Sequence, residues 1–276
     1  MEIKFSSLTY IEKGKKVLDN LNLKFEESKI YAVLGKSDSG KEMLGYLISG
    51  LILPTSGKIE INPFTLTPDK RIKNVNKLRS QIGFVLARPE EQFFSETVKK
   101  EIALGMENFK YRLKEKNKHI SDALKVVGLD DKYLKRDSFT LSLGEQKLVA
   151  LASILAYNPK IIILDDPTYG LDYFRKKELI KLIKMLKRKY KKLIIIISSD
   201  VEFINEVSDY NYVLDKGSLA MEGTNEKVFM NSKYQKMGLE LPKITQFQKM
   251  AKDTKKVKMI YRNQINDLIK EIYRAK

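Results

Sequence analysis

Short apolar runs alternate with amphipathic segments along most of the chain, a pattern that predicts buried strands connected by helices. Leu21, Leu23 and Phe25 alternate with polar residues, as in a half-buried strand. The continuous apolar run at 161–164 fits a central strand that is covered on both faces. The other predicted buried strands are residues 30–34, 59–61, 82–86, 193–197 and 212–214, and helices are expected at 41–52, 118–127, 145–157, 175–190 and 201–207.

This order of elements predicts an α/β fold with a mostly parallel sheet and crossover helices. Residues from about 88 to 158 lack strong strand signals, so we expect a helical insertion between two halves of the sheet. The character changes near residue 225. Pro242 is followed by a Lys-rich segment that predicts one helix with four apolar side chains on one face, namely Tyr261, Ile265, Leu268 and Ile272. We therefore expect a main domain over 1–225 and a small α-rich C-terminal domain over 226–276.

The charge of the chain is strongly basic, but it does not point to nucleic acid. The chain has 52 Lys and Arg residues against 35 Asp and Glu, a formal net charge of +17, and nine of the basic residues are Arg. Bidentate phosphate contacts and groove readout favour Arg, and the lysines are spread over the whole chain. We interpret the charge as a compositional bias and expect no nucleic-acid partner.

Missing residue types narrow the chemistry. The chain has no cysteine, which excludes disulfides and thiolate metal sites. Its single histidine, His119, lies in a charged helical segment and is expected to be solvated. The longest apolar stretches, such as 46–53 and 193–197, are far shorter than the roughly 18 residues that a membrane-spanning helix needs. We expect the protein in the cytosol or on the cytosolic side of a membrane.

A glycine-rich loop follows the predicted strand 30–34 and precedes a predicted helix. It has the spacing Gly-x4-Gly-Lys of a phosphate-binding P-loop, but Glu42 stands where that motif has Ser or Thr. In such a loop the backbone N–H groups and the helix start bind phosphate, and Lys41 would reach the terminal phosphates. A plain turn between strand and helix explains the loop about equally well. The candidate phosphate-binding residues are Gly35, Lys36, Ser37, Asp38, Ser39, Gly40, Lys41 and Glu42.

Two further motifs favour the phosphate interpretation. The apolar run 161–164 ends in Asp165 and Asp166, and a carboxylate at that edge of a sheet beside a P-loop can hold Mg²⁺. Residues 141–146, with the sequence Leu-Ser-Leu-Gly-Glu-Gln, lie at a predicted helix start. Each signal has a structural explanation when taken alone, but the three in this order form a specific combination.

With these motifs the chain resembles the ATP-binding subunit of an ABC transporter over about residues 1–230. The resemblance implies that 35–42 is the Walker A motif and that Asp165 is the Walker B aspartate, followed by Asp166 at the position of the catalytic glutamate. It implies that Tyr10 stacks on adenine and that Asp172 belongs to the D-loop. The signature motif that it implies comprises Ser142, Leu143, Gly144 and Glu145.

Two segments are similar to a narrower group, the energy-coupling factor transporter ATPases. They are residues 238–248 and residues 89–94. The resemblance implies a P-loop ABC-ATPase core with an antiparallel β part near the N-terminus, a helical signature subdomain and a C-terminal domain that dimerises. It also implies ATP and Mg²⁺ as cofactors, with Asp165 as a metal ligand and Glu42 as a candidate second one.

The resemblance further implies an importer subunit that couples ATP binding and hydrolysis to uptake of a vitamin or a metal ion. It would lie at the cytoplasmic side of the cell membrane. Its partners would be a second ATP-binding subunit in a heterodimer, a transmembrane energy-coupling subunit and a substrate-binding membrane subunit. Phe93 and Phe94 would contact the membrane subunit, although core packing explains this pair equally well. Two alternatives stay open: a catalytically inactive scaffold of such a complex, and a non-transport ABC ATPase.

Five positions facing the phosphates depart from the family pattern. Asp38 replaces a glycine and Glu42 a Ser or Thr, so both add negative charge beside a polyphosphate. One such pair at about 4 Å costs up to roughly 4 kcal/mol at an effective dielectric near 20. Ala87 and Ser199 replace the Q-loop glutamine and the switch histidine, and Asp166 is one methylene shorter than glutamate. These changes predict that the chain's own Walker site hydrolyses ATP poorly or not at all.

The signature motif is better preserved. Ser142 and Gly144 remain, whereas Leu143 replaces a glycine and Glu145 replaces the final glutamine. A side chain at position 143 is expected to hinder the close approach that glycine permits. We expect Ser142 and the following helix start to complete the ATP site of a partner subunit.

Overall fold

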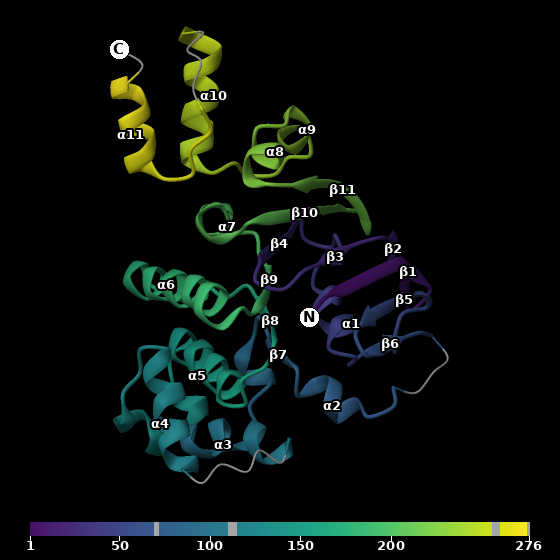
Figure 1. Ribbon diagram of the computed structural model, residues 1–276, viewed down its shortest axis with the longest axis vertical. Coiled ribbons are helices and arrows are strands. Elements are labelled where there is room, and N and C mark those ends of the chain that lie inside the picture. Colours follow the sequence, from purple (N-terminus) through teal and green to yellow (C-terminus); the bar gives the residue numbers. More distant parts are fainter. Residues whose placement is uncertain (69–71, 110–114, 256–259, 275–276) are drawn as a thin grey trace.

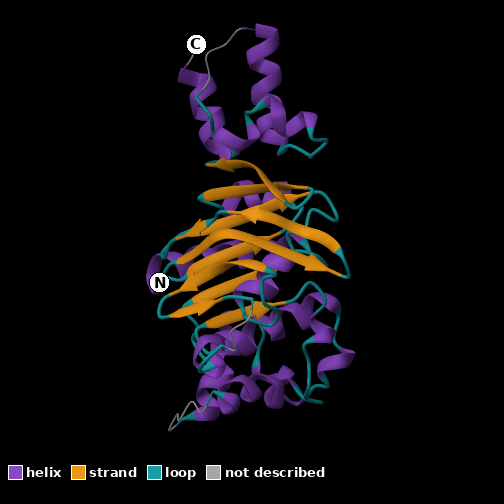
Figure 2. Ribbon diagram, turned by 90° about the vertical axis from the view of Figure 1, so that its right-hand side faces the viewer, coloured by secondary structure: helices purple, strands orange, loops and turns teal. Residues whose placement is uncertain are grey.

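Two β-sheets form the centre of the molecule, and helices extend it at both ends (Figures 1 and 2). The computed structural model describes residues 1–68, 72–109, 115–255 and 260–274. The larger sheet has the strand order β11-β10-β4-β9-β8-β7, with parallel pairing throughout except that β11 is antiparallel to β10. Its strands are β4 (Ile30–Gly35), β7 (Ile82–Val85), β8 (Ile161–Asp165), β9 (Leu193–Ile197), β10 (Tyr210–Asp215) and β11 (Ser218–Gly223).

The central strands of the larger sheet are buried on both faces, as their continuous apolar runs predict. In β8 and β9, Ile162 and Ile196 pack into one hydrophobic core, and Ile163 and Ile195 pack into the other. All four side chains are fully buried. Alternate residues of each strand therefore contribute to opposite cores, and the carboxyl ends of β4 and β8 are held rigidly at one edge.

The smaller sheet is antiparallel and has the order β2-β1-β5-β6, with β3 paired to β1. The alternation that predicted a single strand from Leu21 to Phe25 is divided here, because Leu21 ends one strand and Phe25 ends the next. The predicted strand 59–61 belongs to this sheet. Its strands are β1 (Ile3–Glu12), β2 (Lys15–Leu21), β3 (Lys24–Phe25), β5 (Ser56–Ile61) and β6 (Phe64–Leu66).

Helix α1 (Met43–Ile48) packs into the core that the two sheets share, through Leu44 and Leu47. It is shorter than the predicted helix 41–52. Gly50 has a φ of 63°, a left-handed conformation that is common where helices end. A second short helix, α2 (Val75–Arg79), precedes β7.

Residues between β7 and β8 form the expected helical part, at the lower end of Figure 1. Helix α5 is apolar around most of its circumference and packs against α3 and α4. Isoleucine and leucine side chains of all three helices join the core on one face of the larger sheet. The elements are η1 (Pro89–Glu91), α3 (Val98–Asn108), α4 (Lys116–Val126), η2 (Asp131–Lys135), η3 (Ser138–Thr140) and α5 (Leu143–Ala156).

The remaining helices cover the sheet and form the C-terminal end of the molecule at the top of Figure 1. None of the helices in the described ranges is long and apolar enough to cross a membrane. Helix α8 packs against β10 and β11, and its Phe229 belongs to the same core as α5. The elements are α6 (Tyr173–Tyr190), α7 (Val201–Val207), α8 (Asn225–Phe229), α9 (Ser232–Lys236), α10 (Lys243–Lys255) and α11 (Ile265–Arg274).

The prediction of one helix carrying Tyr261, Ile265, Leu268 and Ile272 was wrong. Tyr261 precedes α11, and its hydroxyl donates a hydrogen bond to Asn205 of α7 at 2.6 Å. Leu268 is buried, whereas Ile265 is two-thirds exposed. The hydrogen bond to α7 places Tyr261 outside the helix, which the periodicity of the segment does not reveal.

Candidate functional site

The loop between β4 and α1 has the closed turn that a P-loop requires. Asp38 and Gly40 have φ values of 63° and 83°, and the Ser39 N–H donates to the Lys36 carbonyl oxygen at 3.2 Å. A Cβ added to Gly40 would lie 2.6 Å from the Val17 carbonyl oxygen, so glycine is required at that position. Asp38 also lies in the left-handed region, which is uncommon for residues other than glycine but which Asp tolerates better than most.

Lys41 is buried beneath this loop and already has an anionic partner. Its Nζ lies 2.6 Å from Glu42 Oε1 and also donates to the Lys36 carbonyl oxygen at 3.4 Å. The lysine expected to reach phosphate therefore forms an ion pair with its neighbour in the sequence.

Two carboxylates end β8, beside this loop. Asp165 is 5 % exposed, and burial raises its pKa to about 7, aided by the negative charges of Asp166 and Glu42. Lys41 and Lys147 act in the opposite direction but do not compensate. Asp166 has a φ of 39°, an uncommon conformation for an aspartate. The predicted metal ligand and the predicted catalytic group thus share one crowded acidic edge.

A buried lysine that the sequence reasoning missed completes this edge. Lys147 of α5 is 3 % exposed, and its Nζ donates a hydrogen bond to the Asp166 carbonyl oxygen. The same Nζ lies 5.5 Å from the centre of the Tyr169 ring. Burial lowers its pKa, and the charges of Asp166 and Asp165 act to raise it. A single lysine that is followed by almost only apolar residues up to the end of the helix was the signal that could have identified it.

An open cavity of about 630 Å³ lies between the loop and the β1–β2 turn. Asp38, Gly40 and Glu42 line one side of it. Tyr10 is not among the lining residues; it is half-buried, and burial together with Glu12 raises its pKa. The cationic side chains that line the cavity are Lys13, Lys15, Lys16 and Lys216.

These residues fit a nucleotide better than they fit a metal ion. Main-chain groups of the closed loop and four nearby lysines suit a polyphosphate. The two predicted Mg²⁺ ligands lie in different surroundings: Glu42 is paired with Lys41, whereas Asp165 is buried beside Asp166. In the parts of the chain that the structure describes, no three metal-ligating side chains cluster. Metal ligation by Asp165 and Glu42 stays a prediction.

The signature segment caps helix α5 through its own side chains. The Ser142 hydroxyl accepts from the Glu145 N–H at 3.4 Å, and Glu145 Oε2 accepts from the Ser142 N–H at 3.0 Å, which together form a capping box. Burial acts to raise the pKa of Glu145, but hydrogen bonds from Tyr133 and Ser142 and the charge of Arg136 outweigh it, and the pKa falls to about 2.

Leu143 and Gly144 face the D-loop of the same chain. A Cβ on Gly144 would lie 2.7 Å from the Gly170 carbonyl oxygen, and the Leu143 side chain packs against Gly170 itself. Leu143 is therefore half-buried by its own chain rather than free at the surface. Asp172 caps α6 by accepting from the Arg175 N–H at 2.8 Å. The signature and D-loop thus form one continuous surface.

The remaining predicted residues separate into buried and exposed ones. Phe93 is buried and packs edge-on against Phe139, whereas Phe94 is 79 % exposed. Core packing thus explains Phe93, and Phe94 alone of the pair is free to contact another protein. Ser199 is exposed and Ala87 is half-buried, and neither side chain carries the imidazole or the carboxamide that the family has at these positions.

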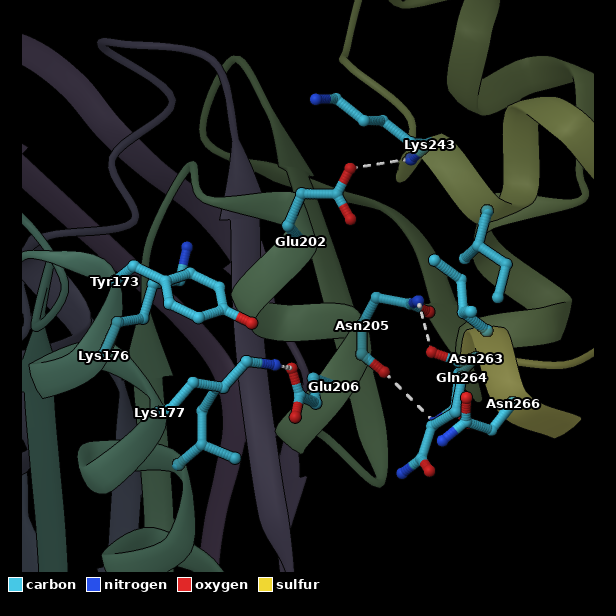
Figure 3. A pocket seen from close by; sticks show the side chains of 13 residues that line it. Tyr173, Lys176, Lys177, Glu202, Asn205, Glu206, Lys243, Asn263, Gln264 and Asn266 are labelled. Carbon is cyan, nitrogen blue, oxygen red and sulfur yellow. Dashed lines mark hydrogen bonds and ion pairs between the residues drawn. The ribbon is translucent and has the colours of Figure 1, made fainter.

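A second cavity, of about 560 Å³, lies between α6, α7 and the C-terminal segment (Figure 3). Lys177 pairs with Glu206 at 2.8 Å, and Glu202 accepts from the Lys243 N–H at 2.7 Å. Asn205 joins α7 to the loop before α11 through Asn263. These contacts attach the C-terminal segment to the α/β core, and the cavity contains none of the predicted site residues.

Comparison with known proteins is consistent with this geometry. The model of the ABC transporter family matches residues 18–169. The energy-coupling factor transporter ATP-binding protein EcfA2 of Caldanaerobacter subterraneus is 36% identical over 229 residues, 83% of this chain and 79% of its own length. That of Clostridium acetobutylicum is 36% identical over 252 residues, covering 89% and 87%.

Solved structures agree in fold. The structure of cbiO1 from Clostridium perfringens, part of the ABC transporter complex cbiONQ, has a TM-score of 0.72 and 30% identity, covering 90% of this chain and 98% of that one. The dimeric ATP-binding cassette MJ0796, bound to ADP and phosphate, has a TM-score of 0.74 and 27% identity, covering 80% and 98%. The chain therefore belongs to the ABC transporter family, and within it to the energy-coupling factor transporter ATP-binding proteins.

Proposed function

We propose that the chain is the ATP-binding subunit of an energy-coupling factor importer that takes up a vitamin or a metal ion. It acts in a heterodimer with a second ATP-binding subunit and docks, from the cytoplasmic side, on a transmembrane subunit that works with a substrate-binding membrane subunit. The observation that carries this proposal is the coexistence of a closed P-loop turn and a capped signature helix in one chain with these relatives.

Several of the predicted residues have a role in this proposal. The loop 35–42 holds the phosphates through its main chain and Lys41, and Tyr10 contacts the adenine. Ser142 and the start of α5 face the nucleotide of the partner subunit, beside the D-loop residue Asp172. Exposed Phe94 contacts the membrane subunit, and the C-terminal domain, 226–276, contributes to dimerisation.

Hydrolysis at the chain's own loop is expected to be slow. Asp166 is the remaining candidate for a general base, but its carboxylate is one methylene shorter than glutamate, and its conformation is constrained by a left-handed φ. Asp38 and Glu42 oppose the negative charge of the phosphates. The signature half is the better-preserved part, which favours hydrolysis at a site made from this signature and the partner's P-loop.

A second candidate is an inactive scaffold that supports its partner without using nucleotide. The Lys41–Glu42 ion pair favours it, because the lysine that would contact phosphate has an internal counter-ion.

Phosphate release by the assembled complex distinguishes these possibilities. We expect Ser142→Arg, which places a bulky group at the signature, to abolish release, because removing one donor aimed at developing phosphate charge typically costs about 100-fold or more. Lys41→Ala should leave a substantial fraction. The opposite ranking would show that the chain hydrolyses ATP at its own loop. If neither variant changes phosphate release, the chain is the inactive scaffold.

A further inference from the structure

The lysine that would face phosphate at the P-loop is covered by a carboxylate of the same chain. Lys41 Nζ and Glu42 Oε1 are 2.6 Å apart, and the Lys41 side chain is 6 % exposed against 39 % for Glu42. The ammonium group thus lies inside, and the carboxylate lies nearer to solvent. A phosphate oxygen and this carboxylate would compete for the same donor, because both are anionic acceptors.

The same relation recurs at the signature. The Ser142 hydroxyl and backbone N–H both donate to Glu145 Oε2, at 2.9 and 3.0 Å, and the Tyr133 hydroxyl donates to Oε1 at 2.7 Å. Arg136 and Arg175 approach Oε1 to 3.9 and 3.7 Å. The serine that would contact a partner's nucleotide is therefore bonded to an internal carboxylate.

We propose that Glu42 and Glu145 act as internal substitutes for phosphate, so that nucleotide binds only by displacing Glu42 from Lys41 and Glu145 from Ser142. This regulation rests on the proposed nucleotide-binding function. It gives one physical reason for both substitutions. Each places a carboxylate against a donor, Lys41 or Ser142, that would otherwise bind a phosphate oxygen.

The two contacts differ in how easily they can be broken. Glu42 is held by one ion pair at a partly exposed position, so its displacement costs about as much as one charge-assisted hydrogen bond. Glu145 is held by several donors and its side chain is 13 % exposed. Nucleotide should therefore displace Glu42 from Lys41 and bind at the P-loop, although with reduced affinity. The contact between Glu145 and Ser142 should break less readily, and this should slow turnover of the complex.

Binding of ATP to the isolated chain tests the P-loop half. Affinity is measured by calorimetry in EDTA and again in Mg²⁺ for the wild type, Glu42→Gln and a control, Glu60→Gln. Glu60 is a matched control because its side chain is also 39 % exposed and pairs with a lysine, Lys58, at 2.9 Å. We expect Glu42→Gln to bind ATP about tenfold more tightly or better in EDTA, and Glu60→Gln to match the wild type.

Each other result has a definite meaning. Unchanged affinity in Glu42→Gln would overturn the proposal, as would weaker binding that is confined to Mg²⁺, which would make Glu42 a metal ligand. If the wild type and all variants melt normally but none binds ATP, the proposed nucleotide function itself fails. Glu42→Ser is a second variant, used if the glutamine lowers the melting temperature.

Phosphate release by the assembled complex tests the signature half. Glu145→Gln keeps the shape of the side chain and removes its charge, and should raise release roughly tenfold if the closed signature limits turnover. The control is Glu178→Gln, an exposed glutamate of α6 paired with Lys181 at 2.8 Å, which should change nothing. Unchanged or lower release in Glu145→Gln, with the complex intact by gel filtration, would refute the signature half of the proposal. Tyr133→Phe removes one hydrogen bond to Glu145 and should raise release in the same direction, but more weakly.

Discussion

The P-loop edge and the start of the signature helix shift the pKa of a carboxylate in opposite directions. The pKa of Asp165 is raised to about 7, because burial, Asp166 and Glu42 all disfavour its charge. The pKa of Glu145 is lowered to about 2, because Tyr133, Ser142 and Arg136 outweigh the effect of burial. Burial opposes ionisation at both carboxylates, and only Glu145 has enough donors and positive charge nearby to outweigh it.

This contrast also bears on catalysis. At the P-loop edge several carboxylates share two lysines, and a further polyanion adds repulsion. At the signature two arginines and the α5 helix start favour anions. Once Glu145 is displaced, the signature half therefore has fewer carboxylates to repel a phosphate than the P-loop edge has.

The largest effect is expected from Asp165→Asn. A carboxylate with a folded pKa near 7 and an ordinary value of 3.8 makes the wild type lose stability as pH rises from about 4 to 7, by up to roughly 4 kcal/mol. Asparagine carries no such cost. Urea unfolding in EDTA at pH 5 and pH 8 should show the variant gaining on the wild type at pH 8, and parallel stabilities would contradict the raised pKa.

Glu145→Gln should show the opposite pH dependence. The lowered pKa stabilises the folded state above pH 4.5, and this contribution is lost as pH falls through about 2. The variant should therefore be less stable than the wild type at pH 6, and the gap should narrow by pH 3. Guanidinium unfolding at both pH values is the measurement; a constant gap would mean that lost packing, not charge, is responsible.

The double change Asp38→Gly, Glu42→Ser should make the P-loop half less acidic and so reduce its electrostatic difference from the signature half. It removes two negative charges and the left-handed φ of 63° from a non-glycine residue. Mg-ATP should bind more tightly by about one to a few kcal/mol, on the scale of screened Coulomb terms. Calorimetry that shows equal or weaker binding would mean that the loop depends on these carboxylates.

The smallest effect is expected from Asp166→Glu in the isolated chain. The added methylene moves the carboxylate toward an attacking water, but Ala87, Ser199 and the loop carboxylates remain unchanged. Phosphate release should stay near background for the wild type and the variant alike. Full turnover from this one substitution would show that the P-loop half is catalytically intact and that the two halves do not differ in this respect.

Much of the fold follows from local patterns. The buried strands of the larger sheet were predicted because continuous apolar runs have few alternatives once helices separate them. The C-terminal helix was misread because hydrogen bonds to α7, rather than periodicity, place Tyr261. Helix α1 was predicted too long for a different reason, because the local turn with Gly50 at positive φ follows its end.

The sequence by itself determined the site motifs, their order and the family, because a P-loop, a signature and a strand-ending aspartate are local spacings. The charge of Glu42 and Glu145 was also visible in the sequence, as was the loss of the glutamine and histidine. Only the tertiary structure decided what those charges do. Lys147, Tyr133, Arg136 and Arg175 come from distant segments, and the contacts they make set the pKa of each carboxylate. Electrostatic energy depends on distances of a few ångströms in a low-dielectric interior, and no spacing along the chain encodes such distances.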